Sequence, residues 1–214
     1  MAQSPKRAKR RAPLSPREVG AERRRFAKQR EVELARRLRE YEAALRVPKR
    51  VVAKRGRAGA ARPARALAPA KRAPPLQILA EGDSWFDYPA LPDGGIISRL
   101  ADRLGVPILN LAKAGDEVRF MLGVEERKEL RKHLVKGGPA GAPWDVLLFS
   151  GGGNDIVDNP MALWVREYEK SKPPGQLLHQ PRFDAALALV RAGYEDLIAL
   201  RDEHSPTTQL LFHA

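Results

Sequence analysis

The feature that most constrains the fold of this chain is a series of four short, mostly apolar runs. Each run is followed within a few residues by a polar or glycine-containing segment, or by the last residues of the sequence. The runs cover residues 76–80, 106–111, 145–150 and 209–212. Short apolar runs bounded by turn residues are typical of strands that are buried on both faces. The sequence therefore predicts four buried strands.

Between these runs, apolar residues recur at helical spacing. One such pattern covers residues 96–104 and stops at Gly105, and a second covers residues 118–134 and ends at two glycines. The most regular pattern steps by four, three, four and three residues through Phe183, Leu187, Val190, Tyr194 and Leu197. Strands that alternate with helices form a parallel sheet through right-handed crossovers, with both faces covered. We therefore predict an α/β fold, which binds ligands beyond the carboxyl ends of its strands.

The first third of the chain differs from the rest in charge. Residues 1–75 hold 24 Lys and Arg and six acidic residues, whereas residues 76–214 hold 15 basic and 20 acidic residues. The formal net charge of +13 over 214 residues therefore averages a strongly basic extension with a mildly acidic part. We predict a basic N-terminal extension over residues 1–75 and an α/β domain over residues 76–214, with the boundary near Pro74 and Pro75.

Within the extension, Ser15, Pro16 and Glu18 form a capping-box pattern with proline at the first helical position. This pattern predicts a helix over about residues 15–46, with an apolar stripe too thin to bury much surface on a core. Residues 47–75 have the composition of a disordered linker. For residues 1–75 we expect at most weak, non-specific contact with nucleic acid or an anionic surface. The alternative is a solubilising extension, which the lack of interleaved aromatic residues favours.

Several classes of protein are excluded by composition. The chain has no cysteine, which excludes disulfide scaffolds, thiolate metal sites and a cysteine nucleophile. Its longest aliphatic or aromatic run is four residues, so we expect no transmembrane segment, and the N-terminus lacks the apolar core of a signal peptide. We therefore expect a cytoplasmic protein. Residues 151–153 match neither a P-loop nor a dinucleotide fingerprint, and we expect no cofactor.

Three polar loops follow the first three predicted strands, so they meet at one edge of the sheet. They cover residues 81–89, 110–116 and 150–155. A serine in a tight turn after a buried strand presents its hydroxyl at that edge, and acyl transfer needs such a nucleophile with donors for an oxyanion. Ser84 is the candidate nucleophile. The N–H groups of Ser84 and Gly115 and the side-chain amide of Asn154 are the candidate donors, and glycine at 115 lets the backbone approach a substrate closely.

These loops resemble the SGNH/GDSL hydrolase family. Gly82, Asp83 and Ser84 match its first motif, with Trp85 in place of leucine; Gly115 matches the second motif; and residues 152–155 match Gly-x-Asn-Asp. The resemblance covers residues 76–214. It implies a three-layer α/β/α sandwich with a flavodoxin-like parallel sheet and no metal or cofactor. It also implies that Ser84 is the nucleophile, that Ser84, Gly115 and Asn154 form the oxyanion hole, and that the substrate is a small-molecule, lipid or sugar ester.

The family's last motif, Asp-x-x-His, which supplies the general base, does not occur in this sequence. We therefore expect residues 76–214 to be a C-terminally incomplete SGNH-like domain, inactive as this chain. The four histidines match no part of that motif, and we expect each of them to be structural or solvated. They are His133, His179, His204 and His213.

Alternatives remain open at this stage. Ser84 is also an ordinary helix-capping or turn residue, and Asn154 an ordinary turn residue. A second function is a catalytically dead SGNH-like module whose basic extension binds nucleic acid or an acidic partner. A third is a metal-dependent phosphoesterase that uses the aspartates of these loops. Those aspartates are Asp83, Asp87, Asp155 and Asp158.

Overall fold

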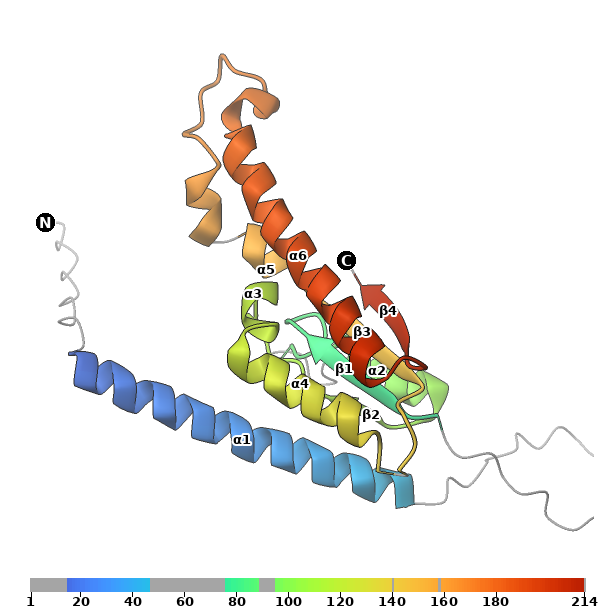
Figure 1. The fold of residues 1–214 in the computed structure, drawn as a ribbon. Helices are drawn as coiled ribbons and strands as arrows, with labels where there is room; N and C mark the ends of the chain where they lie inside the picture. Colours follow the sequence, from blue (N-terminus) through green and yellow to red (C-terminus); the bar gives the residue numbers. More distant parts are fainter. Residues whose placement is uncertain (1–14, 47–75, 89–94, 140, 158, 214) are drawn as a thin grey trace, which may run out of the picture.

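The computed structural model describes residues 15–46, 76–88, 95–139, 141–157 and 159–213, so the predicted linker over residues 47–75 lies outside the described residues. Four strands form one parallel sheet in the order β2-β1-β3-β4 (Figure 1). The strands are β1 (Ile78–Gly82), β2 (Ile108–Asn110), β3 (Val146–Ser150) and β4 (Gln209–His213). Each overlaps a run that the sequence predicts as a strand. The predicted burial on both faces is wrong for β4, where Leu211 is 53% and Phe212 is 45% exposed.

Helices cover both faces of the sheet, which confirms the predicted three-layer α/β/α architecture. On one face, Ile78, Ala80 and Leu148 pack against helix α2 (Ile96–Leu104). On the other face, Leu79 and Phe149 belong to a larger core. Helices α3 (Val118–Met121), α4 (Val124–Lys136) and α6 (Gln180–His204) contribute to that core (Figure 1).

The single helix predicted over residues 118–134 is wrong, because the structure divides it into α3 and α4. Gly123 has an extended backbone with ψ of 176° and precedes α4. Its N–H donates to Phe120 O at 2.9 Å, which closes α3. Glycine in a helix interior is unfavourable by about 1 kcal/mol relative to alanine, and here the helix ends at that residue.

The remaining helical segments lie around α6. They are α5 (Gly153–Ile156) and the 3₁₀ helices η1 (Asn159–Leu163) and η2 (Pro174–Leu177). The C-terminal half of α6 packs on the sheet, and its N-terminal half projects away from it together with η1 and η2 (Figure 1). In the described ranges, no helix has both the length and the apolar content that crossing a bilayer requires.

Helix α1 (Pro16–Arg46) begins with the capping box that the sequence predicts. The Ser15 hydroxyl donates to Glu18 at 2.6 Å, and the Ser15 N–H donates to the same carboxylate at 2.8 Å. Most residues of this helix are exposed, as its thin apolar stripe predicts, but one side chain is buried. Tyr41 is only 3% exposed and packs against Trp144, with ring centroids 5.8 Å apart.

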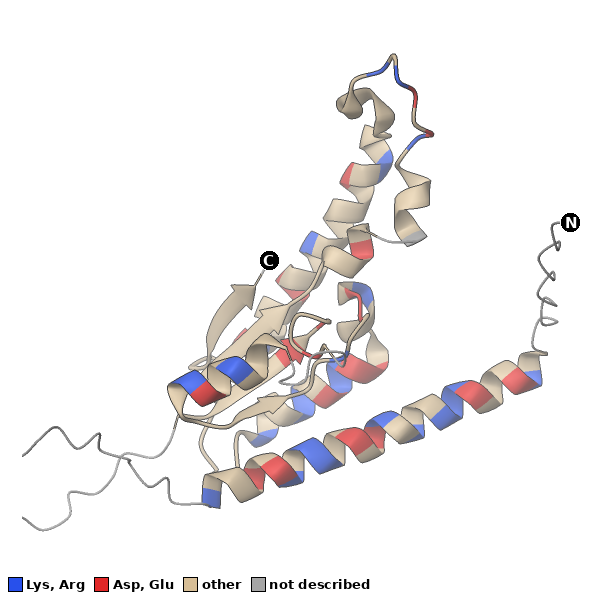
Figure 2. Cartoon of the chain, turned by 180° about the vertical axis from the view of Figure 1, so that it is seen from behind, with Lys and Arg blue, Asp and Glu red and all other residues tan. Residues whose placement is uncertain are grey.

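Leu34, Leu38 and Leu45 lie on the same stripe of α1 as Tyr41 and pack against the same core. The stripe is thin but continuous over the second half of the helix, where α1 lies along the domain (Figure 1). Basic and acidic residues are interspersed along the length of α1 (Figure 2). The second half of helix α1 therefore packs against the larger core.

Candidate active site

The three predicted loops are joined to one another at the carboxyl edge of the sheet. The Lys113 N–H donates to Gly82 O at 2.9 Å, and the Asn110 amide donates to Phe86 O at 2.9 Å. These bonds join the loop after β2 to the turn after β1. The buried Ser150 hydroxyl donates to Asp83 Oδ1 at 2.9 Å, which joins the same turn to the end of β3.

Ser84 lies in the tight turn that follows β1, as predicted. Asp83 holds this turn: its carboxylate accepts the Trp85 N–H at 3.0 Å, and its carbonyl accepts the Phe86 and Asp87 N–H groups, each at 3.1 Å. The residue that caps the turn is therefore Asp83, whereas the Ser84 hydroxyl makes no capping bond. Over the described ranges, neither the hydroxyl nor the N–H of Ser84 has a hydrogen-bond partner.

Gly115 and Asn154 lie on loops that the structure brings together. Gly115 has φ of +80°, and apart from Gly115 and its two chain neighbours, no heavy atom of the described residues lies within 4 Å of the position where a side chain would begin. The Asn154 amide donates to Asp116 O at 2.8 Å, and an amide nitrogen has a second N–H. The Gly115 N–H has no acceptor in the part of the chain that the structure describes. There, no hydrogen bond joins Ser84 to either residue.

The aspartates of these loops support the backbone. Asp155 accepts the Val118 N–H at 2.7 Å and the Arg119 N–H at 3.4 Å, which fixes the start of α3 on the loop after β3. Asp83 holds the Ser84 turn, and Asp158 lies outside the described residues. Among the residues that are described, no three His, Asp or Glu side chains form a group that could hold a metal ion. The phosphoesterase alternative therefore has no set of metal ligands in the described residues.

Two histidines have partners that the sequence did not indicate. His133 Nε2 lies 3.2 Å from Glu129 Oε1, one helical turn away. His204 accepts a hydrogen bond from Arg131 Nε at 2.8 Å, which joins α6 to α4.

His213 lies at the carboxyl end of β4, on the same edge of the sheet as the three loops. Its Nδ1 is 3.4 Å from Ser150 Oγ. Its ring centroid is 5.3 Å from that of Trp85 and 6.1 Å from that of Phe86. His213 therefore contacts residues beside Ser84, but among the described residues no hydrogen bond joins it to Ser84.

Glu81 is a buried carboxyl group two residues before Asp83. It is 5% exposed, and its side chain accepts the Gly82 N–H at 2.9 Å. The pKa of Glu81 is raised to about 7, mainly by burial and also by the nearby carboxylates of Asp116 and Glu126, whereas the Arg30 guanidinium and the Gly82 N–H act to lower it. The sequence does not indicate this group, because Glu81 follows an apolar run as any polar loop residue would.

We expect Glu81 to make the stability of the domain depend on pH. The folded state holds the proton up to about pH 7, whereas the unfolded chain releases it near pH 4.5. The stabilisation is therefore complete below about pH 4.5 and is lost as the pH rises to 7, with a total change of about 3 kcal/mol. Urea unfolding at several pH values measures this change in the natural protein and in Glu81→Gln. Identical pH profiles for the two proteins would contradict the prediction.

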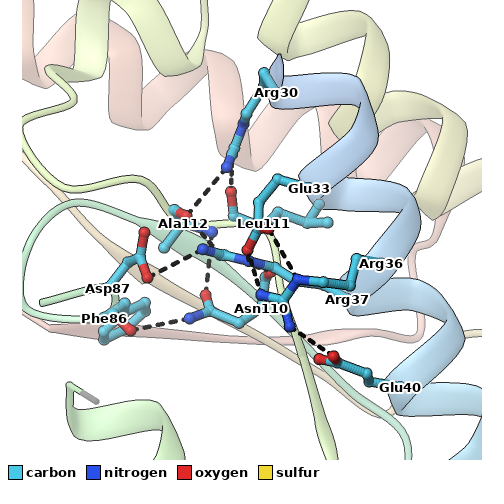
Figure 3. Close-up of polar contacts among 10 residues, drawn as sticks. All are labelled: Arg30, Glu33, Arg36, Arg37, Glu40, Phe86, Asp87, Asn110, Leu111 and Ala112. Atoms are coloured by element: carbon cyan, nitrogen blue, oxygen red, sulfur yellow. Dashed lines mark hydrogen bonds and ion pairs between the residues drawn. The ribbon is translucent and has the colours of Figure 1, made fainter. Parts of the chain in front are cut away.

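Two further residues at this edge come from α1. Arg30 and Arg37 donate to backbone carbonyl groups at the end of β2 and in the loop that follows (Figure 3). These contacts join residues 73 to 82 positions apart in the chain. The extension contains many basic residues, and no local sequence pattern distinguishes Arg30 and Arg37 from the others.

No protein-family model and no curated protein matches this chain. Solved structures do match it. A structure of the Bacillus subtilis protein YXIM has a TM-score of 0.40 at 14% identity, over 64% of this chain and 32% of that one. A Parabacteroides merdae protein described as a GDSL-like lipase has a TM-score of 0.37 at 16% identity, over 64% of this chain and 58% of that one.

A third structure, of a Slackia heliotrinireducens protein described as an SGNH hydrolase, has a TM-score of 0.31 at 15% identity. It matches over 64% of this chain and 54% of that one. The chain thus spans between 32% and 58% of the length of the three structures.

Proposed function

We propose that this protein is a serine hydrolase of the SGNH/GDSL type, which cleaves an ester through an acyl-enzyme formed on Ser84. One observation carries the proposal. At one edge of the sheet, the Ser84 hydroxyl, the Ser84 N–H and the Gly115 N–H have no partner among the described residues. The second N–H of the Asn154 amide is the third donor. A nucleophile and donors left free by the fold are what acyl transfer requires.

The proposed reaction assigns a role to each of these groups. Ser84 Oγ attacks the ester carbonyl carbon, its proton passes through solvent water to the oxygen of the leaving alcohol, and the three donors stabilise the oxyanion. Collapse of the tetrahedral intermediate breaks the ester bond, and the alcohol leaves with a proton. Water then hydrolyses the acyl-enzyme to the acid and restores the Ser84 hydroxyl. The substrate class is an ester of a small molecule, a lipid or a sugar.

The aromatic residues beside Ser84 support an apolar contact with substrate. Trp85 is 59% exposed and Tyr88 is 46% exposed, whereas Phe86 is buried. Trp85 and Tyr88 therefore have apolar surface that a substrate can contact at the proposed site. Aromatic residues more usually pack against the core, as Phe86 does here.

Covalent labelling of the full-length protein by a fluorophosphonate tests this proposal, because the reagent reacts with an activated serine. We expect the label on Ser84, located by mass spectrometry of the digested protein. Ser84→Ala should abolish labelling, and Ser171→Ala, at an exposed serine on the loop before α6, should leave it unchanged. The proposal would be contradicted if the folded protein is not labelled, or if the label is found on a residue other than Ser84.

A second candidate function is a catalytically dead SGNH-like module whose extension contacts a polyanion. The observation that favours it is the distribution of charge. Residues 1–14 and 47–75 together hold 14 Lys and Arg and no acidic residue, and all six acidic residues of the extension lie in α1. Segments of one charge next to a folded domain bind phosphate backbones through counterion release.

Duplex DNA is the probe for this second function. We expect binding that weakens steeply between about 50 and 200 mM salt, as it does when several phosphates are neutralised. Replacing the nine Lys and Arg of residues 47–75 by glutamine should reduce both the affinity and its salt dependence, and this change leaves α1 in place. As a control, Lys128, Lys132 and Lys136 of α4 are replaced in the same way. Equal losses in the two variants would contradict a role for the extension.

A further inference from the structure

The guanidinium group of Arg37 joins the two loops that carry Ser84 and Gly115 (Figure 3). Its Nη1 donates to Asn110 O, at the end of β2, at 3.2 Å and to Ala112 O, in the loop that follows, at 2.8 Å. Its Nη2 lies 3.0 Å from Asp87 Oδ1, on the segment that follows the Ser84 turn. All three guanidinium nitrogens are used, because Nε bonds Glu33 Oε1 at 2.8 Å within α1.

The carbonyl groups that Arg37 binds lie on the free side of an edge strand. Leu111 and Lys113 direct their N–H groups to β1, at 2.7 Å from Ala80 O and 2.9 Å from Gly82 O. Backbone groups alternate in direction along an extended chain, so Asn110 O and Ala112 O face away from β1. On an open edge they would have no protein partner. Arg37 supplies donors to both, and Arg30 adds donors to Leu111 O and Ala112 O.

The position of Arg37 relates this contact to the chemistry of the site. Ala112 begins the loop that leads to Gly115, and Asp87 follows the turn that presents Ser84. One planar group with a fixed set of donors therefore connects the strand end that leads to Gly115 to the segment that follows Ser84. Its side chain is 16% exposed, which protects these bonds from competition by water.

We infer that Arg37 is a positioning residue, which holds the Ser84 turn against the Gly115 loop. On this inference α1 belongs to the catalytic unit. The inference rests on the proposed function for its consequence in catalysis, whereas the contact itself does not depend on activity. A nucleophile and an oxyanion donor held out of register lose rate in the chemical step more than in substrate binding.

The adjacent residue on the same helix provides a matched control. Among the described residues, Arg36 pairs only within α1, with Glu33 and Glu40, and its side chain is 50% exposed. In the full-length protein, Arg37→Met should lower kcat for a short-chain nitrophenyl ester by about tenfold or more, with KM within about twofold. Arg37→Lys, which keeps the charge but not the fork of donors, should retain part of the rate. Arg36→Met should leave both constants within about twofold.

Leu38→Ala distinguishes an effect on the position of the loops from an effect on the stability of the domain. Leu38 packs on the core from α1, and its side chain has no group that can hydrogen-bond to the loops. We expect Leu38→Ala to be at least as destabilising as Arg37→Met and yet to keep its kcat. If kcat follows stability across these variants, or if Arg37→Met and Arg36→Met behave alike, the inference is overturned.

Hydrogen exchange tests whether Arg37 holds the Ser84 turn and the Gly115 loop together, independently of enzyme activity. Arg37→Met should speed exchange of the backbone amides in residues 84–88 and 111–116 by about tenfold, whereas Arg36→Met should not. If the natural protein neither labels nor turns over ester but exchange responds in this way, the proposed function fails and the joining of the loops by Arg37 stands. If the protein is active and exchange in both segments is unchanged by Arg37→Met, the inference fails and the proposed function stands.

Discussion

Deleting residues 1–46 is expected to leave residues 47–214 without a cooperative unfolding transition. The deletion removes Tyr41, Leu34, Leu38 and Leu45 from the larger core and exposes the residues they cover. Burial of such a side chain contributes about 1.5–3 kcal/mol when complete. One complete and three partial burials therefore amount to roughly 5 kcal/mol, which is comparable to the total stability of many domains. The deletion also leaves carbonyl groups of edge strand β2 without their arginine donors.

A pair of aromatic substitutions on α1 tests the same point without removing the helix. Tyr41 lies in the core, and Phe26 is 63% exposed on the half of α1 that the core does not cover. We expect Tyr41→Ala to lower the free energy of unfolding by about 3–5 kcal/mol and Phe26→Ala to change it by about 0.5 kcal/mol or less. Chemical denaturation followed by circular dichroism measures both. If the deletion unfolds as the natural protein does, α1 is a detachable appendage.

This result has a consequence for how the basic extension is studied. A test of polyanion binding that removes residues 1–75 would also remove α1, and a loss of binding could then reflect unfolding. Replacing charges in residues 47–75 avoids this difficulty. The +18 charge of the first 75 residues thus belongs to two kinds of segment. One is a helix of mixed charge that packs on the domain, and the other is a set of flanking residues without acidic side chains.

The α/β core was predictable because its signals are local. Each buried strand is a short apolar run, and the carboxyl ends of parallel strands must share one edge, so the meeting of the loops after β1, β2 and β3 followed from their order. The turn at Ser84 was predictable for the same reason, although the sequence did not show that Asp83 holds the turn and leaves the serine hydroxyl free.

The features that escaped prediction depend on contacts between distant segments. The stripe of α1 is thin by composition, and nothing in residues 15–46 indicates that Tyr41 meets Trp144 or that Arg37 meets Asp87. The pKa of Glu81 depends in the same way on its burial and on charges of distant segments, Arg30 in α1 and Glu126 in α4. The break at Gly123 had a local signal, but the helical spacing on both sides of it was the stronger pattern.

In the full-length protein, Ser84→Ala is expected to reduce ester turnover to the background rate, because no acyl-enzyme can form without the serine hydroxyl. Asn154→Ala should cost about a hundredfold to a thousandfold, as expected for one oxyanion donor. Because the two residues act in one step, the double variant should be little worse than Ser84→Ala alone. Additive losses would indicate that Asn154 acts elsewhere, as it would if its only role were the bond to Asp116 O.

A substitution of His213 provides a comparison for the expected effect of Ser84→Ala on turnover. The ring is held by Trp85, Phe86 and the Ser150 hydroxyl, which is a structural environment. His213→Asn is therefore expected to lower turnover by no more than about tenfold, far less than Ser84→Ala. Removing a general base costs nearly as much as removing the nucleophile, because the two act as a unit. Equal losses in Ser84→Ala and His213→Asn would thus assign the base to His213, with Ser150 and Asp83 orienting its ring.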